Sequence, residues 1–193
     1  MSAEGRVEPA DRPATARVFF ALWPSAEVAD RLADMAGKAV ASFGGRATRR
    51  ETIHLTLAFL GEVPESRLPE LCVVADGVQG QSFTMSLDRL GFWRHNHLLW
   101  AGSQAPVASL GELVGRLRHA LANAGFKVDT EQQGFVPHVT LVRKIPASAG
   151  LLENQQFPSF ESLAWRADRF VLVRSSLSPS GSEYLILREF FMS

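Results

Sequence analysis

Hydrophobic residues along this chain fall into two kinds of run. Short dense runs of four to ten apolar or mixed residues predict β-strands at residues 17–23, 52–61, 136–142, 166–175 and 182–190. Residues 82–92 alternate in part and predict a further strand, which returns after a turn as residues 97–101. Apolar residues spaced by three and four predict helices over residues 25–42, 65–77 and 106–124.

The order of these elements favours one fold class. It runs strand, helix, strand, helix, hairpin, helix, strand, hairpin. Because hairpins rather than helical crossovers join many of the strands, the order predicts an α+β fold with mostly antiparallel sheet. Residues 46–50 form a basic loop in this prediction, residues 61–64 a turn, and residues 128–134 and 144–160 further loops.

Two of the predicted strands carry the same polar pair. His54 and Thr56 lie in the first, and His138 and Thr140 lie in the second, each as His-x-Thr-Leu. Side chains two residues apart on a strand point to the same face, roughly 7 Å apart. Since a titratable side chain in a buried strand is costly unless it is satisfied or used, the repeated pair indicates a site that both strands share.

Two imidazoles facing each other suit one type of reaction. Near neutral pH one can be protonated and the other neutral, so the pair can give and take a proton on opposite sides of a reacting atom. In-line displacement at phosphorus requires this arrangement. Threonine hydroxyls can donate to phosphate oxygens, and Arg143, three residues after Thr140, can hold two such oxygens at once.

Plainer interpretations of the same residues stay open. The two histidines could be satisfied core residues, or they could ligate zinc, although neither motif has a further ligand at close spacing and zinc takes at least three protein ligands. Arg143 could be a surface charge at a strand end. Arg46, Arg49 and Arg50 could be solvated, or could contact an RNA backbone.

Composition limits the partners and the compartment. The 193 residues carry no net charge, which disfavours a broad nucleic-acid surface but allows a short RNA end or a nucleotide in a local pocket. The single cysteine rules out an internal disulfide and suits a reducing compartment, so we expect a cytoplasmic protein. No apolar run approaches the ~18 residues of a membrane span. Residues 1–16, polar and containing two prolines, predict a disordered leader before one domain over residues 17–193.

The doubled motif resembles a known family. His54-Leu55-Thr56-Leu57 and His138-Val139-Thr140-Leu141 are similar to the paired HxTx motifs of the 2H phosphoesterase superfamily. Within it, the chain most resembles the RNA 2′,3′-cyclic phosphodiesterases, also called 2′-5′ RNA ligases. The residues that support this are 17–21, 54–63, 137–138 and Arg143, and the resemblance extends from residue 17 to about residue 190.

The resemblance implies a fold and a reaction. The fold is bilobal, with two mostly antiparallel sheets lining a central cleft, helices on the outside and one motif on each lobe. The reaction is hydrolysis of a 2′,3′-cyclic phosphate on an RNA 3′ end or a nucleotide to a 2′-phosphate, without metal or other cofactor. Its reverse chemistry is ligation without ATP.

Residue roles follow from the resemblance alone. It makes His54 the general acid for the leaving 3′ oxygen and His138 the general base for water, with Thr56 and Thr140 binding the phosphate. We expect a monomer. Two alternatives are a nucleotide- or RNA-binding module without turnover, and a related enzyme acting on another 2′-5′ or cyclic phosphodiester.

Overall fold

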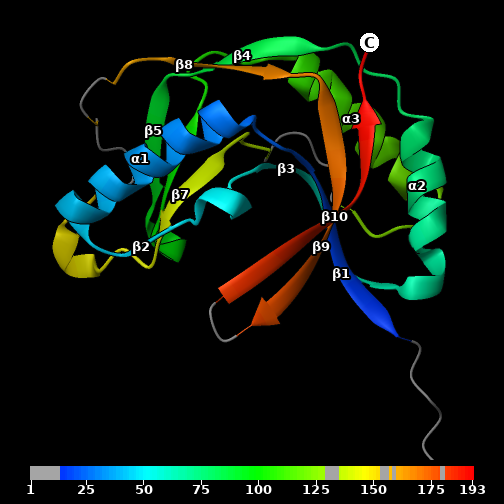
Figure 1. Cartoon of the computed structure of the whole chain (residues 1–193), viewed down its shortest axis with the longest axis horizontal. Helices are drawn as coiled ribbons and strands as arrows, with labels where there is room; N and C mark the ends of the chain where they lie inside the picture. The colour runs from blue at the N-terminus through cyan, green and yellow to red at the C-terminus, as the bar shows by residue number, and fades with distance from the viewer. Residues whose placement is uncertain (1–13, 129–134, 153–156, 158–159, 179–180) are drawn as a thin grey trace, which may run out of the picture.

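The computed structural model of the protein describes residues 14–128, 135–152, 157, 160–178 and 181–193. Over these residues it contains three α-helices, an eight-stranded sheet and a two-stranded sheet (Figure 1). All the strand pairs in the described residues are antiparallel. The predicted α+β fold with mostly antiparallel sheet is confirmed.

The large sheet consists of two halves that meet at its centre. Its order is β10 (Gly181–Phe191), β9 (Arg169–Ser178), β1 (Thr15–Leu22), β3 (Leu55–Pro64), β7 (Val139–Arg143), β6 (Leu98–Gly102) and β5 (Arg89–Trp93), and β2 (Arg46–Ala47) also pairs with β7. Strands β3 and β7 are joined through one residue pair, Leu55 with Val139. Each half therefore contributes one of the two motif strands.

Each half has its own helices (Figure 1). Helix α1 (Ala26–Phe43) packs against β7, and the Ser25 side chain caps it by accepting a hydrogen bond from the amide of Val28. Helix α3 (Ala108–Asn123) contacts β3, and α2 (Leu68–Asp76) contacts α3 and β10. The two-stranded sheet is formed by β4 (Phe83–Leu87) and β8 (Leu163–Ala167), and single turns of 3₁₀-helix cover residues 50–52, 65–67, 94–96 and 147–149.

The two faces of the large sheet are packed differently. The main core includes Phe20, Leu55 and Leu141 together with the inward faces of the helices. A separate small cluster of Phe19, Ala21, Val171 and Val173 lies apart from it, with Trp23, Tyr184 and Ile186 packed on it. Alternation along β1 explains the two groups, since neighbouring residues of a strand point to opposite faces. The face that carries the small cluster is therefore not filled by the main core.

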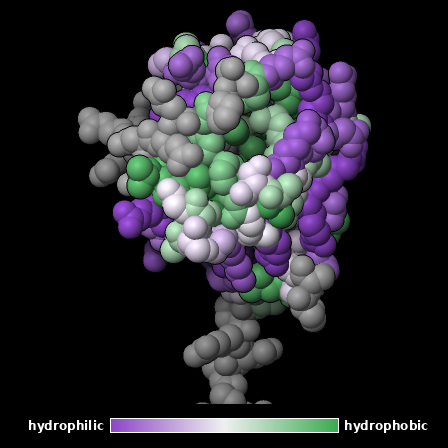
Figure 2. Space-filling model, turned by 90° about the vertical axis from the view of Figure 1, so that its left-hand side faces the viewer, coloured by the Kyte–Doolittle hydropathy of each residue, from purple (hydrophilic) through white to green (hydrophobic). Residues whose placement is uncertain are grey.

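One face of the molecule carries a patch of hydrophobic residues. In Figure 2 these residues gather near the middle of the view, and hydrophilic residues border them on the right. No helix in the described part of the chain is long and apolar enough to cross a membrane.

Several predicted boundaries were wrong for identifiable reasons. The predicted turn at residues 61–64 belongs to β3, because Gly61, with φ of 71°, forms a bulge opposite Val18 and the strand continues. Residues 82–92 are two strands in different sheets, divided at Asp88. Likewise, Asp168 divides β8 from β9, so that β8 was missed in front of the strand predicted from residue 166.

Smaller differences concern the loops and the leader. Thr15 and Ala16 belong to β1, where they pair with Pro64 and Val63, so a disordered leader through residue 16 is wrong for these two. Residues 46–47 of the predicted basic loop form β2. The rest of the leader up to residue 13, and most of the predicted loop at residues 128–134, lie outside the described residues.

One glycine in the second half makes room for the aromatic rings that lie next to His138. Gly91 pairs with Trp100 across β5 and β6, and a Cβ on Gly91 would lie 2.1 Å from the Trp100 ring. The Trp100 ring is in turn 5.4 Å from the ring of Trp93, which is 4.5 Å from that of His138. The absence of a side chain at Gly91 therefore sets where these rings lie.

Gly91→Ala should destabilise the protein by about 1–3 kcal/mol, because Trp100 is buried and must repack around the methyl group. Urea denaturation measures this. The matched control is Gly111→Ala in α3, where nothing lies within 4 Å of the added Cβ and where the protein should gain up to about 1 kcal/mol. Equal effects of the two substitutions would contradict the packing explanation.

Candidate functional site

The register between β3 and β7 places all four motif side chains on one face of the sheet. Leu55 and Val139 are paired, and both are buried in the main core. Residues on either side of them point to the opposite face. His54 and His138 directly precede β3 and β7. A regular antiparallel register around the Leu55–Val139 pair would set His54 opposite Thr140 and Thr56 opposite His138, with the two histidines as diagonal neighbours about 7–8 Å apart.

Both histidine rings are held in the same way. The Nδ1 atom of His54 lies 2.7 Å from the carbonyl oxygen of Thr52, and Nδ1 of His138 lies 2.8 Å from that of Val136. A carbonyl oxygen can only accept, so each Nδ1 must carry the proton. In the neutral ring Nε2 is then the free acceptor, and it is the nitrogen available to a substrate.

Aromatic rings surround His54. Its ring stacks on Trp23 at 5.7 Å and 11°, and it also contacts Phe19 and Tyr184, with centroids 4.9 Å and 5.3 Å away. This burial, together with the charges of Arg143 and His138, lowers the pKa of His54 to about 4, although the hydrogen bond to Thr52 acts to raise it. At neutral pH His54 is uncharged in the free protein.

His138 lies in a similar but separate setting. Its ring meets that of Trp93 edge to face, at 4.5 Å and 74°. Burial lowers its pKa as well, and Arg143 adds to this, against the hydrogen bond to Val136. Because Arg143 acts on the pKa of both histidines, and His138 acts on that of His54, these groups belong to one electrostatic site.

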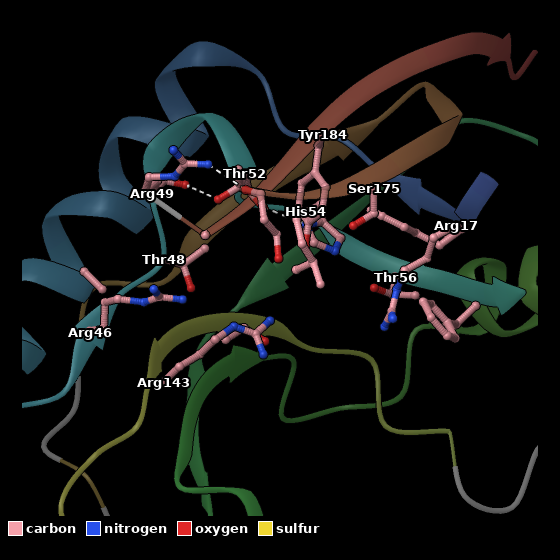
Figure 3. A pocket seen from close by; sticks show the side chains of 17 residues that line it. Arg17, Arg46, Thr48, Arg49, Thr52, His54, Thr56, Arg143, Ser175 and Tyr184 are labelled. Carbon is pink, nitrogen blue, oxygen red and sulfur yellow. Dashed lines mark hydrogen bonds between the residues drawn. The ribbon is translucent and has the colours of Figure 1, made fainter. Parts of the chain in front are cut away.

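A cavity of about 590 Å³ opens next to His54 (Figure 3). Its lining includes three more of the predicted site residues, namely Thr56, Thr140 and Arg143, but His138 is outside the lining set. Four arginines line the cavity, Arg17, Arg46, Arg49 and Arg143, and no aspartate or glutamate is among the described lining residues. The cavity is therefore suited to an anion.

The three arginines before the first motif have different surroundings. Arg46 and Arg49 line the cavity, and Arg49 donates to the carbonyl oxygen of Ser182 at 2.6 Å. Arg50 instead pairs with Asp30 on α1 and is not part of the lining. In the view of Figure 3, Arg46 and Arg49 lie on one side of His54, and Arg17 and Thr56 lie on the other.

Several lining residues were missed from the sequence. Ser175, Leu177, Gly181, Ser182 and Tyr184 come from β9 and β10, which reach the site only because β9 pairs with β1. Nothing local marks the strands as part of a site. A weak signal was available in Tyr184, which is the chain's single tyrosine.

The described residues offer no preformed metal site. Nowhere in this part of the chain do three or more His, Cys, Asp or Glu side chains come together as ligands. What the site does offer is hydroxyl, imidazole and guanidinium groups, which bind a phosphate by charge-assisted hydrogen bonds.

Known proteins resemble this chain along nearly its whole length. The model of the family described as LigT like phosphoesterase matches residues 22–100. The RNA 2′,3′-cyclic phosphodiesterase of Thermotoga maritima is 31% identical over 182 residues, which are 90% of this chain and 94% of that protein. The Escherichia coli protein of the same name is 28% identical over 177 residues, covering 92% and 97%.

Solved structures agree with the sequence comparison. The crystal structure of E. coli LigT complexed with 3′-AMP superposes on this chain with a TM-score of 0.80 at 28% identity, covering 93% of this chain and 99% of that one. The resemblance drawn from the paired motifs is confirmed. The chain belongs to the LigT-like phosphoesterases and, among them, to the family of the RNA 2′,3′-cyclic phosphodiesterases.

Proposed function

We propose that the protein hydrolyses the 2′,3′-cyclic phosphate at an RNA 3′ end, or on a nucleotide, to a 2′-phosphate. The observation that supports this most directly is the pair of His-x-Thr motifs on one sheet face, beside a cavity with four arginines and no described acidic side chain. The relatives in T. maritima and E. coli carry the name of this activity, and E. coli LigT has been solved with 3′-AMP.

In the proposed reaction the two histidines act on opposite sides of the phosphorus. His138 takes a proton from water through Nε2, and the water oxygen forms the new bond to phosphorus. The bond from phosphorus to the 3′ oxygen breaks, and protonated His54 gives its proton to that oxygen. Thr56, Thr140 and Arg143 bind the non-bridging oxygens and stabilise the charge that develops on them.

The low pKa of His54 in the free protein affects its part in this reaction. A neutral His54 cannot donate a proton from Nε2, so it must gain one when the substrate binds. A phosphate anion beside the ring favours the imidazolium and raises its pKa again. Substrate binding is thus proposed to protonate His54, which then acts as the general acid.

The same site could run the reaction with another nucleophile. A 5′-hydroxyl in place of water would give a 2′-5′ linkage, with the energy coming from the cyclic phosphate rather than from ATP. We propose that the protein does this chemistry as a monomer in the cytoplasm and without a cofactor, since both motifs come from one chain and the single cysteine suits a reducing compartment.

His54→Ala and His138→Ala should each lower kcat by about 100-fold or more, the usual effect of losing a general acid or base. Hydrolysis of 2′,3′-cyclic AMP, with the phosphate position in the product identified by phosphorus NMR, measures this. His119→Ala is the matched control, because His119 is exposed on α3 and away from the cavity. Full activity in either motif variant would disprove the roles, and binding without turnover in the unmodified protein would favour a binding module.

The pH dependence should differ between kcat/KM and kcat. The free protein determines kcat/KM, and burial lowers the pKa of both histidines below 6.5. As pH rises above that range the protonated fraction falls, so kcat/KM should peak on the acid side of pH 6.5 and drop about tenfold per pH unit above it. Because bound phosphate favours the imidazolium, kcat should peak at higher pH. A kcat/KM that stays flat from pH 6 to 8 would contradict this.

Chelation should leave turnover unchanged, because the proposed acid, base and phosphate ligands are all side chains. The measurement is the rate of cyclic AMP hydrolysis before and after dialysis against EDTA, and again after a divalent metal is added back. A loss that the added metal restores would require a metal-dependent mechanism instead.

A further inference from the structure

Arg46 is a cavity arginine whose charge no acidic side chain balances in the described part of the chain. It makes no hydrogen bond and no ion pair within the described part of the chain, whereas Arg49 bonds to Ser182 and pairs with Glu51. The guanidinium of Arg17 lies over the Phe59 ring at 4.9 Å. An exposed arginine without a partner is ordinary on an open surface, but Arg46 lines the site cavity.

The fold places this charge directly opposite a second one. Arg46 pairs with Arg143 across β2 and β7, so their side chains share one face and start from neighbouring positions. Like charges directly opposite each other on paired strands destabilise a sheet. In Figure 3 both side chains extend into the same part of the cavity. Anionic groups bound at the two guanidinium groups would offset this repulsion.

The backbone around Arg46 is built for this close pairing. Gly45 has φ of 92°, and a Cβ there would come within 2.9 Å of the Arg143 carbonyl oxygen and of a Val142 methyl group. Only glycine allows β2 to approach β7 so closely. The amide of Thr48 then donates to the Leu141 carbonyl oxygen at 2.8 Å and extends the contact.

The opposite wall lies close to the guanidinium. Gly181, at the start of β10, lies beside the guanidinium, since a Cβ there would be 3.6 Å from a terminal nitrogen of Arg46, an ordinary contact distance. Arg49 ties the same strand to the motif loop through Ser182. The guanidinium of Arg46 therefore lies in the cavity between β7 on one side and the start of β10 on the other.

The two arginines are placed differently with respect to the reacting centre. The charge of Arg143 lowers the pKa of both motif histidines, whereas Arg46 is not among the charges that act on either of them. Arg143 also lies on a motif strand, three residues after Thr140, whereas Arg46 lies on β2, outside both motif strands. This placement fits Arg143 to the reacting phosphate and Arg46 to a position beyond it. In an RNA end the next anion is the phosphodiester that precedes the terminal nucleoside.

We infer that Arg46 binds this preceding phosphodiester, so that the site selects an RNA end over a cyclic mononucleotide. The inference rests on the proposed function and adds a second anion position to it. The guanidinium donates two hydrogen bonds to the non-bridging oxygens, as its planar fork allows. Arg46 is then a specificity residue that makes no contact with the reacting phosphorus.

The test compares two substrates that differ by one phosphodiester. These are 2′,3′-cyclic AMP and the dinucleotide ApA with a 2′,3′-cyclic phosphate end, and the readout is the ratio of their kcat/KM values. Arg46→Gln should lower the dinucleotide-to-mononucleotide ratio by about 10-fold or more, the effect of losing a charge-assisted contact. Arg46→Lys, which keeps the charge, should retain part of it. The salt dependence of dinucleotide binding should weaken by about 0.7 in logarithmic slope.

Two controls separate this effect from general charge and from folding. Arg166→Gln removes the same charge from an exposed position on β8 and should leave the ratio unchanged. A dinucleotide with an uncharged methylphosphonate linkage should lose the preference in the unmodified protein and lose nothing further in Arg46→Gln. The thermal stability of Arg46→Gln should be equal or higher, because a like-charge pair has been relieved.

The outcomes distinguish the two proposals. If the unmodified protein hydrolyses both substrates but Arg46→Gln leaves the ratio unchanged, the second anion position is disproved and the function stands. If it hydrolyses neither substrate, the function fails, and calorimetry with ApA 2′-phosphate against adenosine 2′-phosphate decides on Arg46. Tighter binding of the dinucleotide that Arg46→Gln abolishes would support the position, and equal affinities would overturn it.

Discussion

The pairing of Leu55 with Val139 is the contact on which the site depends. It is the point where β3 meets β7, and through it the two halves of the large sheet become continuous. Because side chains alternate along a strand, a shift of either strand by one residue would turn its histidine and threonine into the core and its leucine or valine toward solvent. The burial of Leu55 and Val139 in the core sets a high cost on such a shift and so holds the two motifs on one face.

The free protein and a bound anion affect the histidines of this face in opposite directions. Burial and the charge of Arg143 lower the pKa of both histidines in the free protein, while the cavity arginines attract an anion, whose charge favours the imidazolium. Positive charge is concentrated here, although the chain as a whole carries no net charge. A protein without net charge can therefore bind an anion, because a few guanidinium groups around one cavity suffice.

The sequence was most informative where a pattern repeats or is long. The doubled motif identified the family, and the regular apolar spacing of residues 25–42 and 106–124 predicted α1 and α3 to within a few residues. It was least informative where one residue interrupts a strand. Asp88 and Asp168 each end one strand and precede another in a different sheet, and Gly61 allows a bulge where a turn was expected. The positions of Tyr184 and Arg46 in the cavity wall depend on which strands pair, which no local pattern contains.

The position of β1 between β3 and β9 has a consequence for how the protein is made. Its two partner strands are far apart in the sequence. Arg17 pairs with Glu62 on one side and with Ser175 on the other. During synthesis β3 follows β1 early, but β9 leaves the ribosome much later, so one edge of an almost wholly buried apolar strand stays unpaired in the meantime. The nascent chain thus carries an exposed sheet edge until β9 is made, and the cavity lacks the wall that β9 and β10 supply until these two strands have added to that edge.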